Sequence, residues 1–149
     1  MRRGEGDLAQ TSVKESEMSK HAGSCLCGQV RFEIEGDFDR FFFCHCSRCR
    51  KGTGTAHGAN LFSATAKVTW LAGEDKVTRY RVPDARHSKA FCSNCGGALP
   101  RESPSLLVVP AGSLDTDVHT KPTAHIFVAS RANWDKNLEL VPAFDTLPS

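Results

Sequence analysis

The chain has 149 residues, a formal net charge of +2 and 40% hydrophobic residues. This length fits a single domain with a hydrophobic core of its own. The nearly neutral charge argues against a nucleic acid or a membrane surface as the partner. The sequence has no apolar run of about 18 residues, so it predicts no transmembrane helix.

Residues 1–20 are polar and lack periodicity, which predicts a disordered leader ahead of a domain over residues 21–149. No apolar stretch typical of a secretory signal follows the first arginines. We therefore expect the protein in a reducing cytoplasm. There, clustered cysteines bind metal or do chemistry more often than they form disulfides.

The first patterned segment has Val30, Phe32 and Ile34 alternating with charged residues, which predicts a half-buried strand. A loop rich in glycine and threonine is expected over residues 51–58. Further short strands are predicted at residues 59–63, 67–71, 77–82, 88–91, 106–110 and 125–129. No long amphipathic helix is apparent. The pattern is typical of a mainly β domain built from folded antiparallel sheets.

Seven cysteines fall into three groups: Cys25 and Cys27, then Cys44, Cys46 and Cys49, then Cys92 and Cys95. In the last group two intervening residues let the chain turn so that both sulfurs face one metal, and Gly96 permits the positive φ of such a turn. In the first group the sulfurs share one face of an extended segment. The odd count argues against a complete disulfide framework.

Zinc prefers four tetrahedral ligands, so seven thiolates suffice for one closed site and a second site with an open position. Pairing the first and last groups would make a closed, structural site. The middle group would leave a coordination position free for water or a substrate, which is the catalytic pattern. Spacing alone leaves other partitions of the seven open, and a redox-active pair without metal is a further alternative.

Three cysteine-containing stretches together resemble the glutathione-dependent formaldehyde-activating enzyme (GFA) family, also called the centromere protein V domain family. They are residues 23–30 (GSCLCGQV), 44–51 (CHCSRCRK) and 91–96 (FCSNCG). A C-terminal set is also similar to that family: residues 125–128 (HIFV), Ser130, Arg131, Trp134 and residues 142–144 (PAF). The resemblance spans about residues 20–145.

The resemblance implies a mainly β fold of the β-tent type with two zinc ions. It assigns the structural zinc to Cys25, Cys27, Cys92 and Cys95, and the second, catalytic zinc to Cys44, Cys46 and Cys49. It further implies a carbon–sulfur lyase that forms S-(hydroxymethyl)glutathione from formaldehyde and glutathione. The expected partners are therefore a small thiol and an aldehyde, and no nucleic acid or membrane. A non-catalytic zinc module that binds a partner protein is the alternative.

Charged and histidine residues around the middle group have two interpretations each. Arg48, Arg50 and Lys51 could receive the carboxylates of glutathione, or they could be solvated surface charges. His45 lies between two cysteines, and on an extended segment its side chain would point away from the metal face, as a packing or supporting residue. His125 could carry a proton near pH 7 or be a hydrogen-bonded structural histidine.

Overall fold

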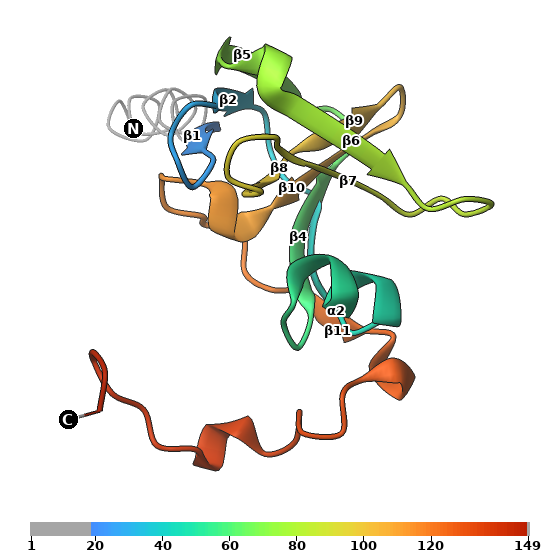
Figure 1. Cartoon of the computed structure of the whole chain (residues 1–149), viewed down its shortest axis with the longest axis vertical. Helices are drawn as coiled ribbons and strands as arrows, with labels where there is room; N and C mark the ends of the chain where they lie inside the picture. The colour runs from blue at the N-terminus through green and yellow to red at the C-terminus, as the bar shows by residue number, and fades with distance from the viewer. Residues whose placement is uncertain (1–18, 149) are drawn as a thin grey trace, which may run out of the picture.

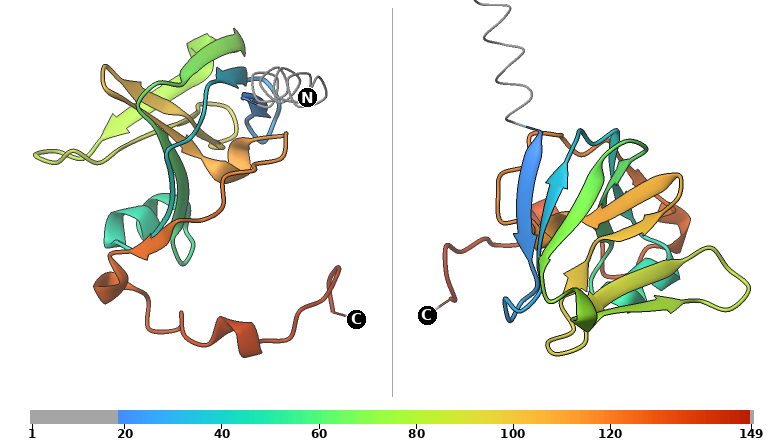
Figure 2. Two further views of the ribbon diagram at one scale, coloured as in Figure 1. Left: turned by 180° about the vertical axis from the view of Figure 1, so that it is seen from behind. Right: turned by 90° about the horizontal axis from the view of Figure 1, so that it is seen from above.

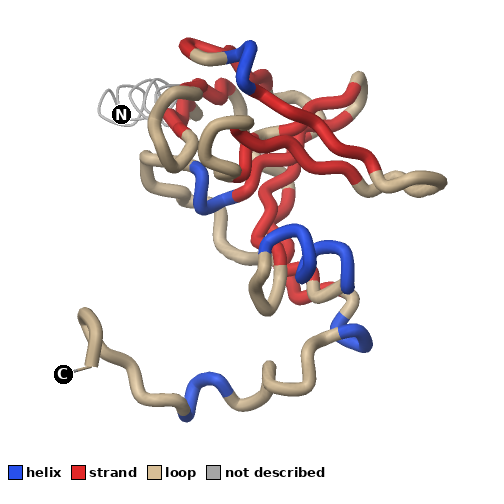
Figure 3. Tube along the Cα trace, viewed as in Figure 1, coloured by secondary structure: helices blue, strands red, loops and turns tan. Residues whose placement is uncertain are grey.

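A computed structural model describes residues 19–148 of the chain. The predicted leader lies outside the described residues except at its end, where the first strand begins at Lys20. Short strands make up most of the regular structure (Figure 3). They form three sheets, and all but one of the strand pairs within the described residues are antiparallel. The expected mainly β class is confirmed.

The first sheet has the order β1-β2-β5, with β1 at Lys20–Ser24, β2 at Arg31–Glu35 and β5 at Lys67–Ala72. Its middle strand follows the predicted alternation. Phe32 and Ile34 are fully buried, whereas Arg31 and Glu35 at the strand ends are exposed. Figure 2 shows the three strands side by side when the molecule is seen from above.

The second sheet has five strands in the order β11-β3-β4-β10-β9. Their bounds are Ala124–Ile126 for β11, Arg40–Cys44 for β3, Gly58–Ser63 for β4, Leu106–Pro110 for β10 and Arg101–Ser103 for β9. β11 runs parallel to β3, which places His125 beside Phe43. The strand predicted at 125–129 ends early because Phe127 adopts a left-handed φ of 55° and a 3₁₀ turn follows at Val128–Ser130.

The third sheet has the order β6-β7-β8, with β6 at Val77–Arg81, β7 at Ser88–Cys92 and β8 at Ala98–Leu99. A 3₁₀ turn at Glu74–Lys76 leads into β6, and another at Ala111–Ser113 follows β10. All three sheets contribute to one core, whose fully buried members include Val30, Phe32, Ile34, Leu61, Leu99 and Val109. This shared core fixes the positions of the strand ends that carry the cysteines.

Helix α2 spans Ser47–Thr53, so it includes the start of the loop that we expected over 51–58. It begins after Cys46, which is extended and whose sulfur accepts a bond from the Cys49 amide at 3.4 Å. It ends at Gly54, whose left-handed φ of 68° is typical of a helix C-terminus. In the described part of the chain, no helix has the length and apolarity that a bilayer span requires.

Residues 127–148 leave the strands as an extended C-terminal arm with a 3₁₀ turn at Leu138–Leu140 (Figure 1). Several of its large apolar side chains are exposed, namely Phe127, Trp134, Leu140, Phe144 and Leu147. Ala132 and Asp135 are the buried residues of this arm. The contact between the arm and the body is therefore concentrated near these two positions.

Candidate metal centres and substrate cavity

Four cysteines from two distant parts of the chain meet in one group. Cys25 and Cys27 lie in the connection from β1 to β2, while Cys92 ends β7 and Cys95 lies in the turn towards β8. Their sulfurs are all within 4.8 Å of one another, with 3.6 Å between Cys25 and Cys27 and 4.0 Å between Cys27 and Cys92. A tetrahedral site with Zn–S bonds of about 2.3 Å has sulfurs roughly 3.8 Å apart. The group therefore fits a metal ion.

Several N–H groups point at these sulfurs. The Val30 amide donates to Cys25 Sγ at 3.3 Å, the Gly97 amide to Cys95 Sγ at 3.4 Å, and Nδ2 of Asn94 to Cys27 Sγ at 3.3 Å. The side-chain bond from Asn94 is the main cause that lowers the pKa of Cys27 to about 6. Such donors stabilise thiolates, which are the form that binds metal. Sequence reasoning did not single out Asn94.

The remaining three cysteines form a second group at the start of helix α2. Cys44 ends β3, Cys46 precedes the helix and Cys49 lies in its first turn. Their sulfurs also lie within 4.8 Å of one another. Cys44 and Cys49 are buried, and this burial raises the pKa of both thiols. Three sulfur donors hold a metal ion and leave one coordination position to another ligand.

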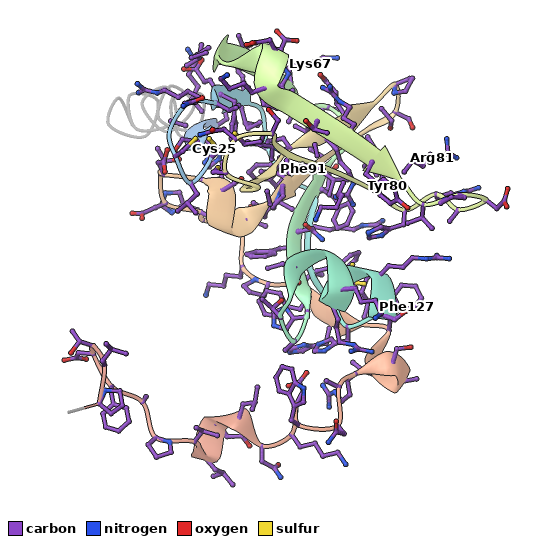
Figure 4. The ribbon with its side chains drawn as sticks, viewed as in Figure 1. Cys25, Lys67, Tyr80, Arg81, Phe91 and Phe127 are labelled. Atoms are coloured by element: carbon purple, nitrogen blue, oxygen red, sulfur yellow. The ribbon has the colours of Figure 1, made fainter. Side chains whose placement is uncertain are left out.

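The two groups are separate in space. Figure 4 shows Cys25 among the strands of the body, well away from helix α2. The structure thus gathers the same four and the same three sulfurs that the resemblance assigns to two sites. Spacing alone had left this partition open.

A cavity of about 240 Å³ adjoins the second group, with Cys49 in its wall. Part of its lining is apolar and comes from Ala90, Leu99 and Pro110. The ionisable residues of the lining, apart from the cysteine, are all basic: Arg48, His87, Lys89 and Arg101. The cavity therefore combines a soft metal-binding wall with a cationic one.

Only one of the three basic residues expected at the site lines the cavity. Arg48 lines the cavity, whereas Arg50 and Lys51 are on the same helix but outside the lining. Their role towards glutathione stays a prediction. His87, Lys89 and Arg101 were not foreseen, because they come from the segment before β7, from β7 and from β9. Only tertiary structure brings them to Cys49, and no motif marks them in the sequence.

Lysine 89 connects the two sides of the cavity. Its Nζ donates to the carbonyl oxygen of Gly52 near the C-terminal end of α2 at 2.8 Å. Carbonyl groups at a helix C-terminus carry partial negative charge, so this contact partly satisfies the ammonium group. Lys89 thereby holds β7 against the helix that carries Cys49.

Three histidines, His45, His57 and His125, cluster on the face of the sheet opposite to the Cys44 sulfur. Phe43 and Cys44 are consecutive in β3, so their side chains point to opposite faces of the sheet. The Phe43 ring stacks on His57 at 4.5 Å and contacts His125 at 5.3 Å between centroids. His45 joins the same cluster, with its ring 5.0 Å from each of these two histidines. His45 thus points away from the metal face, as the extended segment predicts.

Comparisons with known proteins agree with the geometry of the two cysteine groups. A protein of Halomonas elongata named "Putative glutathione-dependent formaldehyde-activating enzyme" is 32% identical over 125 residues, covering 75% of this chain and 77% of that protein. A crystal structure of a Rhodobacter sphaeroides protein superposes with a TM-score of 0.50 and 24% identity. It covers 70% of this chain and 98% of the other, and it supports the fold.

The family model described as "Glutathione-dependent formaldehyde-activating enzyme" matches residues 20–130, a range that contains all seven cysteines, the four basic residues of the cavity and His125. The match therefore covers both metal-binding groups and the cavity between the sheets and α2. With the sulfur geometry, this extent of agreement leads to one conclusion: the chain belongs to the glutathione-dependent formaldehyde-activating enzyme family.

Proposed function

We propose that this protein catalyses the addition of a thiol, glutathione in the first place, to formaldehyde or a related aldehyde, with zinc at both cysteine groups. The reaction is that of a carbon–sulfur lyase taken in the direction of synthesis. One observation carries the proposal: Cys49, one of three cysteines whose sulfurs can hold a metal ion, lines a cationic cavity of about 240 Å³. A small anionic thiol fits that combination of soft metal and positive charge.

Zinc is the metal that the donor sets favour. Sulfur donors alone suit zinc better than magnesium or calcium, which take oxygen ligands. The group of four is closed and has the pattern of a structural site, whereas the group of three has the pattern of a catalytic site. When bound by Cys44, Cys46 and Cys49, zinc would supply a lowered thiol pKa or a polarised carbonyl.

The reaction itself is an addition without oxidation or reduction. A sulfur lone pair forms the new C–S bond, the π electrons of the carbonyl move to its oxygen, and the thiol proton ends on that oxygen. The side chains of the protein would bind the anionic thiol and exclude water from part of the cavity. Cationic Arg48 stands at the cavity wall beside Cys49, and the apolar side chains of Ala90 and Leu99 exclude water from that wall.

A non-catalytic zinc module is the second candidate. It would need the two metal groups but no cavity beside the group of three, so the cavity favours an enzyme. We place the reaction in a reducing cytoplasm, since all seven cysteines are free and a metal-binding set depends on reduced thiols.

The test compares zinc-loaded wild-type protein with the Cys46→Ser variant. Metal content is measured first, and two zinc ions per chain are expected. The rate of S-(hydroxymethyl)glutathione formation is then followed by exchange NMR at a pH where the spontaneous reaction is slow. We expect acceleration by the wild type and none by Cys46→Ser, which should keep the fold. A fully zinc-loaded wild type that does not exceed the spontaneous rate would overturn the proposed activity.

A further inference from the structure

The cavity beside Cys49 has the charge pattern of a site for one particular end of the thiol. We propose that it binds a carboxylate with no ammonium group beside it, and that Arg101 is the specificity-determining residue that pairs with this carboxylate. In glutathione this is the glycine end. The inference rests on the proposed thiol–aldehyde reaction and adds the orientation of the thiol substrate to it.

Over residues 19–148, the cavity is lined by basic side chains without acidic ones. Arg48, His87, Lys89 and Arg101 line it, and its lining, all within the described residues, includes no aspartate or glutamate. Burial lowers the pKa of His87, and the charges of Arg101, Arg48 and Lys89 lower it further. Cations that repel one another in a partly desolvated site are stabilised by a bound anion.

Among the described residues, neither arginine of the lining has an acidic partner, and Arg101 is half-buried whereas Arg48 is exposed. Lys89 already donates to the Gly52 carbonyl at 2.8 Å. For Arg101, by contrast, no acidic group of the described residues lies within ion-pair distance. Arg101 is half-buried on β9, and this burial lowers the pKa of its guanidinium, while the nearby Cys49 sulfur acts in the opposite direction. A planar guanidinium in this state suits a carboxylate, which it can bind through two parallel hydrogen bonds.

The absence of acidic lining residues decides which end of glutathione enters. The γ-glutamyl end carries an α-ammonium group, which the cationic side chains of Arg48, Lys89 and Arg101 would repel and no carboxylate of the lining would receive. The glycine end carries only a carboxylate. Ligand pockets usually begin at about 300 Å³, so a cavity of about 240 Å³ encloses part of a tripeptide and leaves the γ-glutamyl end towards solvent.

The experiment separates the two ends chemically. Zinc-loaded protein is assayed with glutathione, with glutathione esterified at glycine and with N-acetylcysteinylglycine, which lacks the γ-glutamyl residue but keeps its nitrogen as an amide. We expect the ester to raise KM roughly 30-fold or more, as for the loss of a partly buried charge pair, and N-acetylcysteinylglycine to change KM by less than about threefold. Arg101→Gln should give glutathione and its ester the same KM, with kcat largely retained.

Two further variants serve as controls. Arg101→Lys keeps the charge but not the planar fork, so it should recover part of the discrimination between glutathione and its ester. Arg86→Gln removes an exposed arginine outside the lining and should leave the discrimination unchanged. Thermal unfolding followed by circular dichroism verifies that each variant is folded.

Binding is measured separately from turnover, by calorimetric titration with S-methylglutathione and its glycine ester. If wild-type protein accelerates the reaction but does not distinguish glutathione from its ester, the inference is overturned while the proposed function stands. If no thiol is accelerated, the proposed function fails and the calorimetry decides the inference. Tighter binding of the free carboxylate that depends on Arg101 would support it, and equal or absent binding would overturn it.

Discussion

His45 and His125, 80 residues apart in the chain, are joined by a 2.8 Å contact between Nε2 of His45 and Nδ1 of His125. The parallel pairing of β11 with β3 makes this contact possible. On its other side, Nδ1 of His45 lies 3.0 Å from Oδ2 of Asp135 in the C-terminal arm. Burial lowers the pKa of His45 against the opposing effect of Asp135. A neutral imidazole thus ties the segment between Cys44 and Cys46 to both later parts of the chain.

Replacing Asp135 by asparagine tests this anchor. Asp135→Asn removes the negative charge that faces the buried imidazole and should lower the free energy of unfolding by about 1 to 3 kcal/mol. Urea unfolding of the zinc-loaded protein measures the change. Asp145→Asn, an exposed position of the same arm, is the matched control and should have no effect. Equal losses in both variants would show that His45 and Asp135 do not stabilise the arm.

The two cysteine groups should respond differently to the loss of a ligand. Cys95→Ser opens the group that joins the β1–β2 connection to β7, so we expect the loss of one metal ion and at least about 3 kcal/mol, or roughly 10 °C in Tm. Cys46→Ser should lose the other metal ion with a smaller change in Tm. Metal analysis and calorimetric scans distinguish the two. A larger drop for Cys46→Ser would reverse the structural and catalytic assignments.

Asn94 should tune the affinity of the group of four. Without its bond to Cys27, the pKa of that thiol should rise from about 6 towards the ordinary value of 9.0. More protons then compete with the metal, so Asn94→Ala should weaken metal binding about tenfold, and more at pH 6 than at pH 8. Competition with a coloured chelator measures the affinity. Asn133→Ala, on the exposed arm, is the control, and an identical affinity of the two variants would contradict the prediction.

His87 is a spectroscopic reporter of the charge in the cavity. Its folded pKa lies below the unfolded value of about 6.5, so its contribution to stability is present above pH 6.5 and lost as the pH falls. Arg101→Gln should raise this pKa, because Arg101 is the first of the charges that lower it. Binding of S-methylglutathione to the wild type should raise it as well. Histidine NMR titration follows both shifts. Arg40→Gln, far along β3, is the control and should leave the pKa of His87 unchanged.

Local sequence patterns predicted those elements that depend mainly on residues close together in the chain. Alternation around Phe32 and Ile34 predicted β2, because each face of a strand has a single environment. The helix over Ser47–Thr53 has seven residues and is capped by a cysteine sulfur, so it shows neither the length nor the usual capping residue by which a helix is predicted.

The basic cavity could not be predicted for a different reason. Arg101 reaches the site through the pairing of β9 with β10 and of β10 with β4, and strand pairing over such distances leaves no short-range pattern. The basic residues next to the cysteines in sequence were the natural expectation. Of these, Arg48 alone faces the cavity, because a helix directs neighbouring side chains to different sides.

The contrast between a local and a long-range set of sulfurs has a consequence for biosynthesis. Cys44, Cys46 and Cys49 lie within one short stretch, so a nascent chain holds all three as soon as α2 has left the ribosome. The other set closes a loop in which Cys27 and Cys92 are 65 residues apart, and it waits for β7 and for the entropy cost of that closure. We therefore expect metal to be acquired in a fixed order during translation, first at the set of three and only later at the set of four, which joins the β1–β2 connection to β7.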